Sequence, residues 1–198
     1  MFDLETGRRY KEAFTAVESL FEKACKKKAL DLEIKQCLRC PDMNKKNMTE
    51  SAVGYGSLNA KIFLVGQSLC TQCMNTQIPF TRGSGYLVDA ALCLCAMARK
   101  DVFITNVVHC HPLHNRASEP KEIRRCLSYL RRELDIVRPE LVVTLGASAR
   151  ESLLKLLDKN TPLFKIYSVR HPAYFLHAGF EGAKDWIISL ATKMERYK

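Results

Sequence analysis

The sequence contains no apolar run that approaches the roughly 20 residues needed to cross a membrane. Its first ten residues are mostly polar, with Glu5, Arg8 and Arg9, and they do not resemble a signal peptide. Nine cysteines in a chain without a secretory signal indicate a reducing compartment, where thiols bind metal or stay free rather than pair. We therefore expect a cytoplasmic (intracellular) protein with no membrane partner.

Three common catalytic signatures are also missing. The sequence has no G-x-S-x-G of a serine hydrolase, no G-x-x-x-x-G-K-[ST] phosphate loop and no G-x-G-x-x-G dinucleotide turn. It has no internal repeat or low-complexity tract, and 198 residues suit one domain with a sizeable core. We expect residues 1–198 to form a single domain, with residues 1–36 as an N-terminal helical extension.

Acidic residues are in deficit, with 21 Asp and Glu against 31 Lys and Arg. The resulting net charge of +10 and the isoelectric point near 9.2 favour a polyanionic partner such as nucleic acid. Because many soluble proteins are basic, charge alone leaves this partner open.

What the sequence does contain is an alternation of strand and helix patterns. Four short apolar runs predict buried strands: Ile62–Val65 (ended by Gly66), Val102–Val108, Leu141–Leu145 and Ile166–Val169. Helical spacing covers residues 10–32, 147–157 and 183–197, and a further apolar stripe runs from Ile123 to Val137 after Ser118 as its N-cap. Such alternation predicts a three-layer α/β/α sandwich with a central, four-stranded, mostly parallel sheet.

Polar residues and glycine turns follow the predicted strands, where parallel sheets bind ligands. Gly66 is followed by Gln67 and Ser68, Asn106 lies near the end of the second strand, and His171 follows the fourth. Singly, Asn106 could satisfy buried backbone groups and His171 could cap a turn. Together they suit the recognition of a flat heterocycle.

Four of the nine cysteines have the spacing of a metal or cluster site. Cys37 and Cys40 form a C-x-x-C pair among charged residues, which is unusual for a protein core. Cys110 ends a strand pattern and Cys126 lies inside a helix pattern, so metal binding would join the N-terminal segment to the domain. By contrast, Cys93 and Cys95 lie in an apolar stretch and are expected to be core residues.

Four separated blocks of the sequence resemble the iron–sulfur (family 4) uracil-DNA glycosylases. Residues 105–116 are similar to that family's T-N-V-V-K-C-R-P-P-G-N-R stretch, and 76–85 to its T-G-R-P-F-V-G-x-A-G loop. Residues 138–146 resemble its R-P-x-x-I-V-T-L-G strand, and 171–173 match the start of its H-P-[AS] motif. The blocks occur in the family's order, and the resemblance extends from about Leu32 to the C-terminus.

The resemblance implies a monofunctional hydrolase that excises uracil from DNA in base excision repair, acting as a monomer. Cys37, Cys40, Cys110 and Cys126 would hold a structural [4Fe–4S] cluster. Phe80 would stack on the flipped base beside Gly66, Asn106 would read its edge, and His171 would stabilise the departing uracil anion. Residues that would contact the DNA are Arg170, Tyr174 and Phe175, with Leu176 as a further candidate for the wedge that fills the gap in the duplex.

The turn after the first predicted strand departs from the family. The family's G-E-[AG]-P-G is replaced by Gly66-Gln67-Ser68-Leu69-Cys70, so no carboxylate is present to place the attacking water. Gln67 has a precedent in the G-Q-D-P-Y-H of family 1 enzymes, and Gln67 and Ser68 are the catalytic candidates in this turn. The same loop adds a second C-x-x-C, Cys70 to Cys73.

Three alternatives follow from these departures. The chain could be a weakly active or inactive relative that binds DNA, or a glycosylase for another deaminated base such as hypoxanthine. It could also be a zinc-stapled interaction module without catalytic activity.

Overall fold

The computed structural model describes residues 4–157, 163–176 and 179–198. Its centre is a five-stranded sheet with the strand order β1-β3-β2-β4-β5. The strands are β1 (Tyr55–Gly56), β2 (Ile62–Ser68), β3 (Phe103–Val108), β4 (Leu141–Leu145) and β5 (Lys165–Val169). All neighbours are parallel except β1, which is antiparallel to β3.

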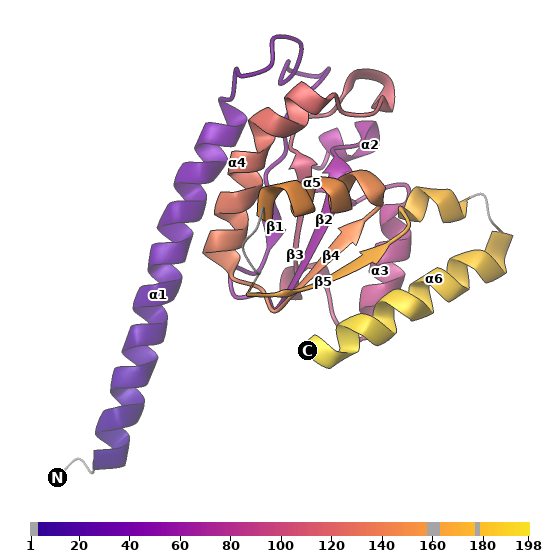
Figure 1. Cartoon of the computed structure of the whole chain (residues 1–198). Helices are drawn as coiled ribbons and strands as arrows, with labels where there is room; N and C mark the ends of the chain where they lie inside the picture. Colours follow the sequence, from indigo (N-terminus) through magenta and orange to yellow (C-terminus); the bar gives the residue numbers. More distant parts are fainter. Residues whose placement is uncertain (1–3, 158–162, 177–178) are drawn as a thin grey trace.

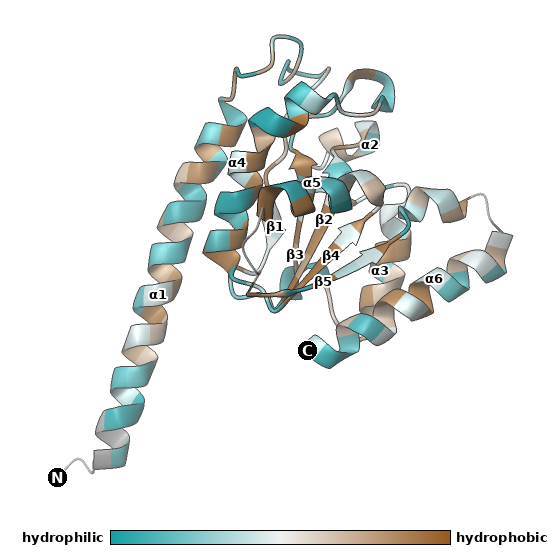
Figure 2. Cartoon of the chain, in the orientation of Figure 1, coloured by the Kyte–Doolittle hydropathy of each residue, from teal (hydrophilic) through white to brown (hydrophobic). Residues whose placement is uncertain are grey.

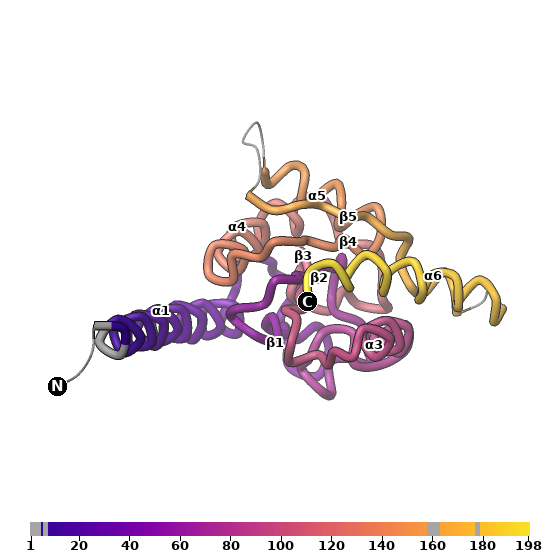
Figure 3. The backbone as a smooth tube through the Cα atoms, turned by 90° about the horizontal axis from the view of Figure 1, so that it is seen from below, coloured from indigo at the N-terminus to yellow at the C-terminus, as the bar shows by residue number. Residues whose placement is uncertain are grey.

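Helices cover both faces of this sheet (Figure 1, Figure 3). One face packs against α1 (Leu4–Lys35), α4 (Pro120–Val137) and α5 (Ala147–Leu157), and the other against α3 (Gly85–Leu94) and α6 (Gly179–Met194). Side chains alternate along β2, so that Phe63 and Val65 join the first core and Ile62 and Leu64 join the second. The predicted α/β/α sandwich is confirmed.

The short elements complete the chain. They are α2 (Thr71–Met74) and the 3₁₀ helices η1 (Arg99–Asp101), η2 (Leu113–Asn115), η3 (Pro172–Leu176) and η4 (Glu195–Tyr197). Figure 2 shows the central strands β2 and β3 as mostly hydrophobic and much of α1 as hydrophilic, since the first half of α1 projects away from the sheet. No helix among the described residues is long and apolar enough to cross a membrane.

The number of strands differs from the prediction by one. The additional strand, β1, consists of Tyr55 and Gly56, a segment outside the four apolar runs. Two residues are too few to show an alternating pattern, and their pairing with Phe103 and Ile104 is formed only in the folded chain. Gly56 is required there, because a Cβ at this position would lie 1.8 Å from the carbonyl oxygen of Val102.

Several predicted boundaries were wrong. Helix α1 extends from residue 4 to 35 rather than 10 to 32, and α6 begins at Gly179 with its last turn, η4, in 3₁₀ form. Strand β2 continues past Gly66 to Ser68. Strand β5 is at the sheet edge and is only partly buried, because one of its sides has no neighbouring strand.

The predicted N-cap of α4, Ser118, was also wrong. The helix begins at Pro120 and its cap is Glu119, whose backbone N–H donates to Glu122 Oε2 at 2.7 Å. Proline suits the first helical position because it has no N–H to satisfy there. Ser118 therefore lies outside the helix.

Two expectations about cysteines need correction as well. Cys95 is buried as expected, but Cys93 is exposed on α3. Cys70 and Cys73 form a disulfide, whereas all cysteines were expected to be free or bound to metal. Cys70 is the N-cap of α2 and Cys73 lies in its first turn, which brings the two sulfurs together.

Candidate active site and cysteine cluster

A pocket of about 570 Å³ opens where the parallel strands end. Its wall consists of residues from the end of β2, from the loops that follow β2, β3 and β5, and from the loop before α3. These include Gln67, Ser68, Arg82, Asn115, Arg116 and His171. Folding thus brings together segments that are more than 100 residues apart in the sequence.

Asn106 lies behind this pocket, in a tight group with Gly66 and Phe80. A Cβ placed on Gly66 would lie 2.5 Å from the Phe80 ring and 2.7 Å from Asn106 Oδ1. Asn106 is 2% exposed and Phe80 8% exposed. The Oδ1 atom of Asn106 is buried without a hydrogen-bond partner. An orphaned acceptor of this kind is costly unless a ligand supplies the missing donor.

The backbone at Phe80 is held in a left-handed conformation with φ 59°. Arg99, in η1, donates to the carbonyl oxygens of Pro79 (3.0 Å) and Phe80, and its Nε lies 2.6 Å from Asp89 Oδ1. These contacts fix the loop that presents the Phe80 ring. The sequence analysis did not identify Arg99, since nothing in a polar stretch indicates that its arginine donates hydrogen bonds to backbone carbonyl groups far away in the sequence.

His171 lines the pocket and lies next to Phe80 of this group. Its ring centroid is 5.9 Å from that of Phe80. The backbone N–H of Ala173 donates to its Nδ1 at 3.2 Å, so neutral His171 carries its proton on Nε2. Burial lowers the pKa of His171 below its ordinary value of 6.5. The site therefore presents a neutral imidazole with a free N–H donor.

The loop after β2 is held in place by the buried side chain of His111, which is 2% exposed. Its Nδ1 donates to the carbonyl oxygen of Leu69 at 3.0 Å, and its Nε2 accepts from Thr71 Oγ1 at 3.2 Å. The disulfide between Cys70 and Cys73 closes the same loop. Gln67 and Ser68 line the pocket just before this fixed segment, and in the described structure their side chains make no hydrogen bond.

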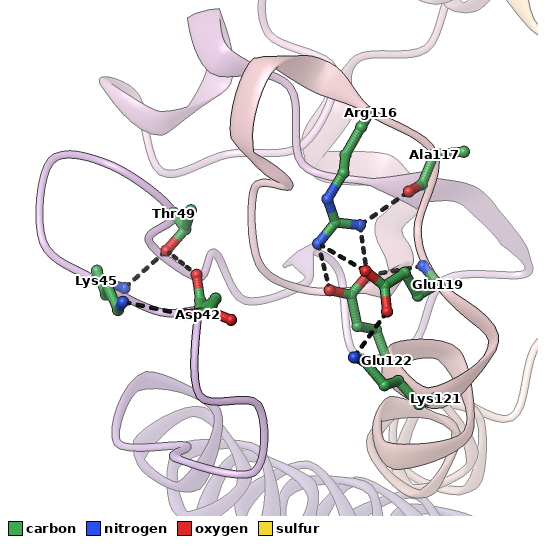
Figure 4. A network of polar contacts seen from close by, with 8 residues as sticks. All are labelled: Asp42, Lys45, Thr49, Arg116, Ala117, Glu119, Lys121 and Glu122. Carbon is green, nitrogen blue, oxygen red and sulfur yellow. Dashed lines mark hydrogen bonds and ion pairs between the residues drawn. The ribbon is translucent and has the colours of Figure 1, made fainter.

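Arg116 connects the pocket to the start of α4 (Figure 4). Its guanidinium forms a bidentate pair with Glu122 at 2.5 and 3.0 Å, and it also donates to the carbonyl oxygen of Ala117 at 2.9 Å. Figure 4 shows a second, separate group in which Thr49 Oγ1 accepts from the N–H of Lys45 and donates to the carbonyl oxygen of Asp42. The first group orders the loop before α4, and the second orders the loop after Cys40.

The three predicted DNA-contacting residues lie beside His171 but differ in exposure. The Arg170 guanidinium lies 5.0 Å from the centroid of the Tyr174 ring, and Tyr174 is 59% exposed. Phe175 instead packs toward the core, with its ring centroid 6.1 Å from that of Trp186. Leu176, in the same 3₁₀ turn, is 49% exposed.

The four predicted metal-binding cysteines converge between the end of α1, the end of β3 and α4. All four are free, and Cys37 and Cys40 pack against the core that contains Cys110 and Cys126. Burial, followed by the nearby sulfurs of the other three, raises the pKa of Cys110. Arg39 fixes the C-x-x-C turn to α4 by donating to the carbonyl oxygen of Arg125 and to Ser128 Oγ, each at 2.9 Å.

The surroundings of these thiols suit thiolate ligands. Backbone N–H groups of Asn44 and His109 lie against the sulfurs of Cys110 and Cys126, as they do against cluster thiolates. In the part of the chain that the structure describes, no three His, Cys, Asp or Glu side chains are grouped to hold one metal ion.

A buried pair, His109 and Glu133, lies next to the cysteines and was missed by the sequence analysis. His109 Nε2 and Glu133 Oε2 are 3.9 Å apart, and both atoms are buried without a hydrogen-bond partner. Burial raises the pKa of Glu133 to about 7 and lowers that of His109 to about 4. At neutral pH His109 is therefore uncharged and Glu133 is only partly ionised. A single glutamate in a helix with many charged residues gives no signal that it is buried.

Comparison with known proteins adds a family match. A family model described as the uracil DNA glycosylase superfamily matches residues 53–192. A Type-4 uracil-DNA glycosylase from Archaeoglobus fulgidus is 35% identical over 126 residues, which cover 64% of this chain and 62% of that protein. One from Thermotoga maritima is 35% identical over 117 residues, with 59% of each chain covered.

A Type-5 uracil-DNA glycosylase from Pyrobaculum aerophilum is also similar. It is 32% identical over 145 residues, which cover 60% of this chain and 64% of that protein. The chain thus spans about 60% of the length of these curated relatives.

Proposed function

The chain belongs to the uracil DNA glycosylase superfamily, and on this premise we propose that it hydrolyses the N-glycosidic bond of uracil in DNA, in base excision repair. The observation that carries the proposal is the orphaned Oδ1 of Asn106, enclosed by Gly66 and Phe80. A base that enters this space offers a ring N–H to that oxygen and a carbonyl to the amide N–H₂. Uracil has this pattern of donor and acceptor, whereas cytosine has the opposite one at its edge.

In this proposal Phe80 stacks on the extruded base. Gly66 allows the close approach, because any side chain at position 66 would meet both the Phe80 ring and the Asn106 amide. Removing a base from the duplex costs a few kcal/mol, which stacking and hydrogen bonds in the pocket must offset.

His171 supplies the stabilisation of the leaving group. As the glycosidic bond breaks, negative charge develops on uracil, and the Nε2–H of neutral His171 donates to the O2 of the base. A fixed donor of this type acts mainly on the transition state, so its effect falls on the chemical step.

Gln67 and Ser68 orient the attacking water through hydrogen bonds. Neither is a carboxylate, so general-base assistance is absent, and such assistance is typically worth 10²–10⁴-fold. Because bond breaking leads in a dissociative reaction of this kind, leaving-group stabilisation maintains a slow but measurable turnover.

The DNA contacts lie on the rim of the pocket. Arg170 and the pocket-lining Arg82 would meet phosphates, and the net charge of +10 favours a polyanion. Tyr174 and Leu176 are exposed and serve as the wedge, whereas the inward packing of Phe175 gives it a supporting role.

Cys37, Cys40, Cys110 and Cys126 would hold a [4Fe–4S] cluster with a structural role. The cluster would cross-link the end of α1 to β3 and α4, and this cross-link would order the loops next to the pocket. Its presence would exclude the alternative of a zinc-stapled module.

The test is single-turnover excision by anaerobically purified protein. Oligonucleotides with uracil opposite guanine, uracil opposite adenine, single-stranded uracil or hypoxanthine are treated with alkali to reveal abasic sites. We expect release of uracil, strongly reduced in Asn106→Ala and unchanged in Asn59→Ala, a control on the surface. Metal analysis of the same preparation should find about four irons per chain.

Three outcomes contradict parts of this proposal. Release of hypoxanthine but not uracil would assign another deaminated base. DNA binding without excision of any base would make the chain a non-catalytic relative. Full activity in Asn106→Ala would place the base-reading pocket elsewhere.

A further inference from the structure

A groove of about 520 Å³ lies beside the pocket, between α2 and the start of α3. Its lining residues are Gln72, Asn75, Arg82, Gly83 and Tyr86. Gln72, Arg82 and Gly83 also line the pocket, so the two spaces are continuous. Asn75 and Tyr86 line the groove alone, so a base held in the pocket leaves this part of the groove open.

The loop from Phe80 to Tyr86 carries two aromatic rings in different surroundings. The ring of Phe80 is buried in the base-reading group, whereas Tyr86 is 57% exposed. Arg99 donates to the carbonyl oxygens of both Phe80 and Gly85, and a Cβ on Gly85 would lie 1.6 Å from the carbonyl oxygen of Phe80. The two ends of the loop are therefore held together, and Tyr86 directly follows the fixed Gly85.

The opposite wall of the groove, α2, is also held in place. The disulfide between Cys70 and Cys73 closes its first turn. Gln72, inside the helix, and Asn75, its C-cap, are exposed. Both walls are thus ordered without a ligand, which lowers the entropic cost of binding one.

The polar side chains of the groove have no partner within residues 4–157, 163–176 and 179–198. The guanidinium of Arg82 forms no ion pair or hydrogen bond there, and the side chains of Gln72, Asn75 and Tyr86 form no hydrogen bond. A cation without a carboxylate suits a phosphate, and an exposed aromatic ring suits a base, because every base has a π-face. The groove therefore offers one group for each part of a nucleotide.

We propose that this groove binds the nucleotide next to the extruded uracil in the same DNA strand. The base of that nucleotide stacks on Tyr86, and its phosphate meets Arg82. The amides of Gln72 and Asn75 form hydrogen bonds with the edge of the base. This inference rests on the proposed glycosylase function, because it takes the uracil as already held against Phe80. Since neighbouring nucleotides are covalently linked, a space continuous with the pocket is where the next nucleotide of the strand can lie.

Such a groove favours uracil in single-stranded DNA. In a duplex the neighbouring base is paired and stacked, and it reaches Tyr86 only if it also leaves the stack, which costs free energy. In a single strand the same base is free to turn toward the groove. Wild-type protein should therefore have a higher kcat/KM for uracil in a single strand than in a duplex, and Tyr86 should supply part of the difference.

The test is a double-mutant cycle between Tyr86 and the neighbouring base, measured as single-turnover kcat/KM on single-stranded oligonucleotides. A tetrahydrofuran spacer, which keeps the phosphate but has no base, replaces the nucleotide 5′ of uracil in one substrate and 3′ of uracil in another. On one of these sides the spacer should lower kcat/KM of the wild type by about 5- to 150-fold, the range for one base stacked on an aromatic ring. Tyr86→Ala should lose a similar factor on the unmodified substrate and little more with the spacer.

Matched variants separate stacking from other effects. Tyr86→Phe keeps the ring and should give the wild-type result in the cycle. Tyr55→Ala changes an exposed tyrosine of β1, which pairs with the start of β3 and so lies away from the pocket; it should leave kcat/KM unchanged on every substrate.

The phosphate contact has a test of its own. Arg82→Ala should reduce the slope of log Kd against log salt concentration by about 0.7 for single-stranded DNA, the value for one phosphate contact. Arg196→Ala is the control, because the C-terminal end of the chain contacts Lys61, before the start of β2, and lies away from the pocket. It should leave the slope unchanged.

Binding is measured in parallel with oligonucleotides that contain 2′-deoxy-2′-fluorouridine, whose glycosidic bond resists cleavage. If the cycle is seen in binding but wild type excises no uracil, the groove is supported and the glycosylase proposal fails. If the cycle is absent from both measurements, the groove proposal is overturned, whether or not uracil is excised. A ratio of single-stranded to duplex kcat/KM that is the same in wild type and Tyr86→Ala would also overturn it.

Discussion

Arg99 offers the sharpest test of how this fold presents the ring of Phe80, which we propose stacks on the base. It does not line the pocket, yet it holds the carbonyl oxygens of Pro79 and Phe80 and is itself held by Asp89. Phe80 has a φ of 59°, a conformation that costs a non-glycine residue about 1–2 kcal/mol. Hydrogen bonds from a charged donor contribute about 1.5–3 kcal/mol each, so those of Arg99 are sufficient to maintain this strain.

In Arg99→Ala the strained backbone is released, and the ring leaves its stacking position for most of the time. A change of 1–2 kcal/mol corresponds to a factor of about 5–30 in population, so kcat/KM for uracil excision should fall by about this factor. The melting temperature should fall by about 4–8 °C for a loss near 2 kcal/mol. Arg99→Lys should restore little, because one ammonium group cannot reach both carbonyls and Asp89.

The assay is single-turnover excision at several enzyme concentrations, combined with thermal unfolding. Lys100→Ala, at the next and exposed position of η1, is the matched control and should behave as wild type. If Arg99→Ala lowers the melting temperature but leaves kcat/KM unchanged, Arg99 stabilises the fold without positioning Phe80. If neither quantity changes, the reasoning fails entirely.

Three further predictions follow from the site. Gly66→Ala should abolish excision and cost about 1–3 kcal/mol of unfolding free energy, since its methyl group would lie 2.5 Å from the Phe80 ring; activity near wild type would contradict the packing described. The fall of kcat/KM on the acid side should lie below pH 6.5, because the pKa of His171 is lowered and a protonated Nδ1–H would repel the N–H of Ala173. His171→Ala should lose most activity, and its remaining activity should no longer show this fall. Cys37→Ala should contain less iron and be less soluble than wild type, whereas Cys93→Ala, a change at an exposed site, should not. Equal iron content in the two variants would show that Cys37 is not a ligand.

The hydrophobic periodicity of the sequence was sufficient to predict the three layers of the fold. Continuous apolar runs such as Leu141–Leu145 predict strands that are buried on both faces, and β4 has the predicted boundaries. The rule that parallel sheets bind ligands at their carboxyl ends placed Gly66, Asn106 and His171 at one edge, and the structure brings them together around Phe80. The spacing of the cysteines likewise predicted that distant segments meet.

Other features depend on tertiary contacts that no local pattern records. The clamp of Arg99 on the Phe80 backbone and the burial of Glu133 beside His109 each join residues about 20 or more positions apart. Their side chains are of ordinary polar types, so only packing distinguishes them from solvated surface residues. For the same reason β1 was missed, since its two residues become a strand only when they pair with β3.

The sequence by itself therefore determined the α/β/α architecture, the edge of the sheet where the site forms and the residue types in it. Those properties follow from local periodicity and from the direction of parallel strands, which are encoded along the chain. Only the tertiary structure decided which polar atoms are left without a partner and which backbone is strained. These properties depend on what the rest of the chain places next to each group, and that is fixed only when the chain is folded.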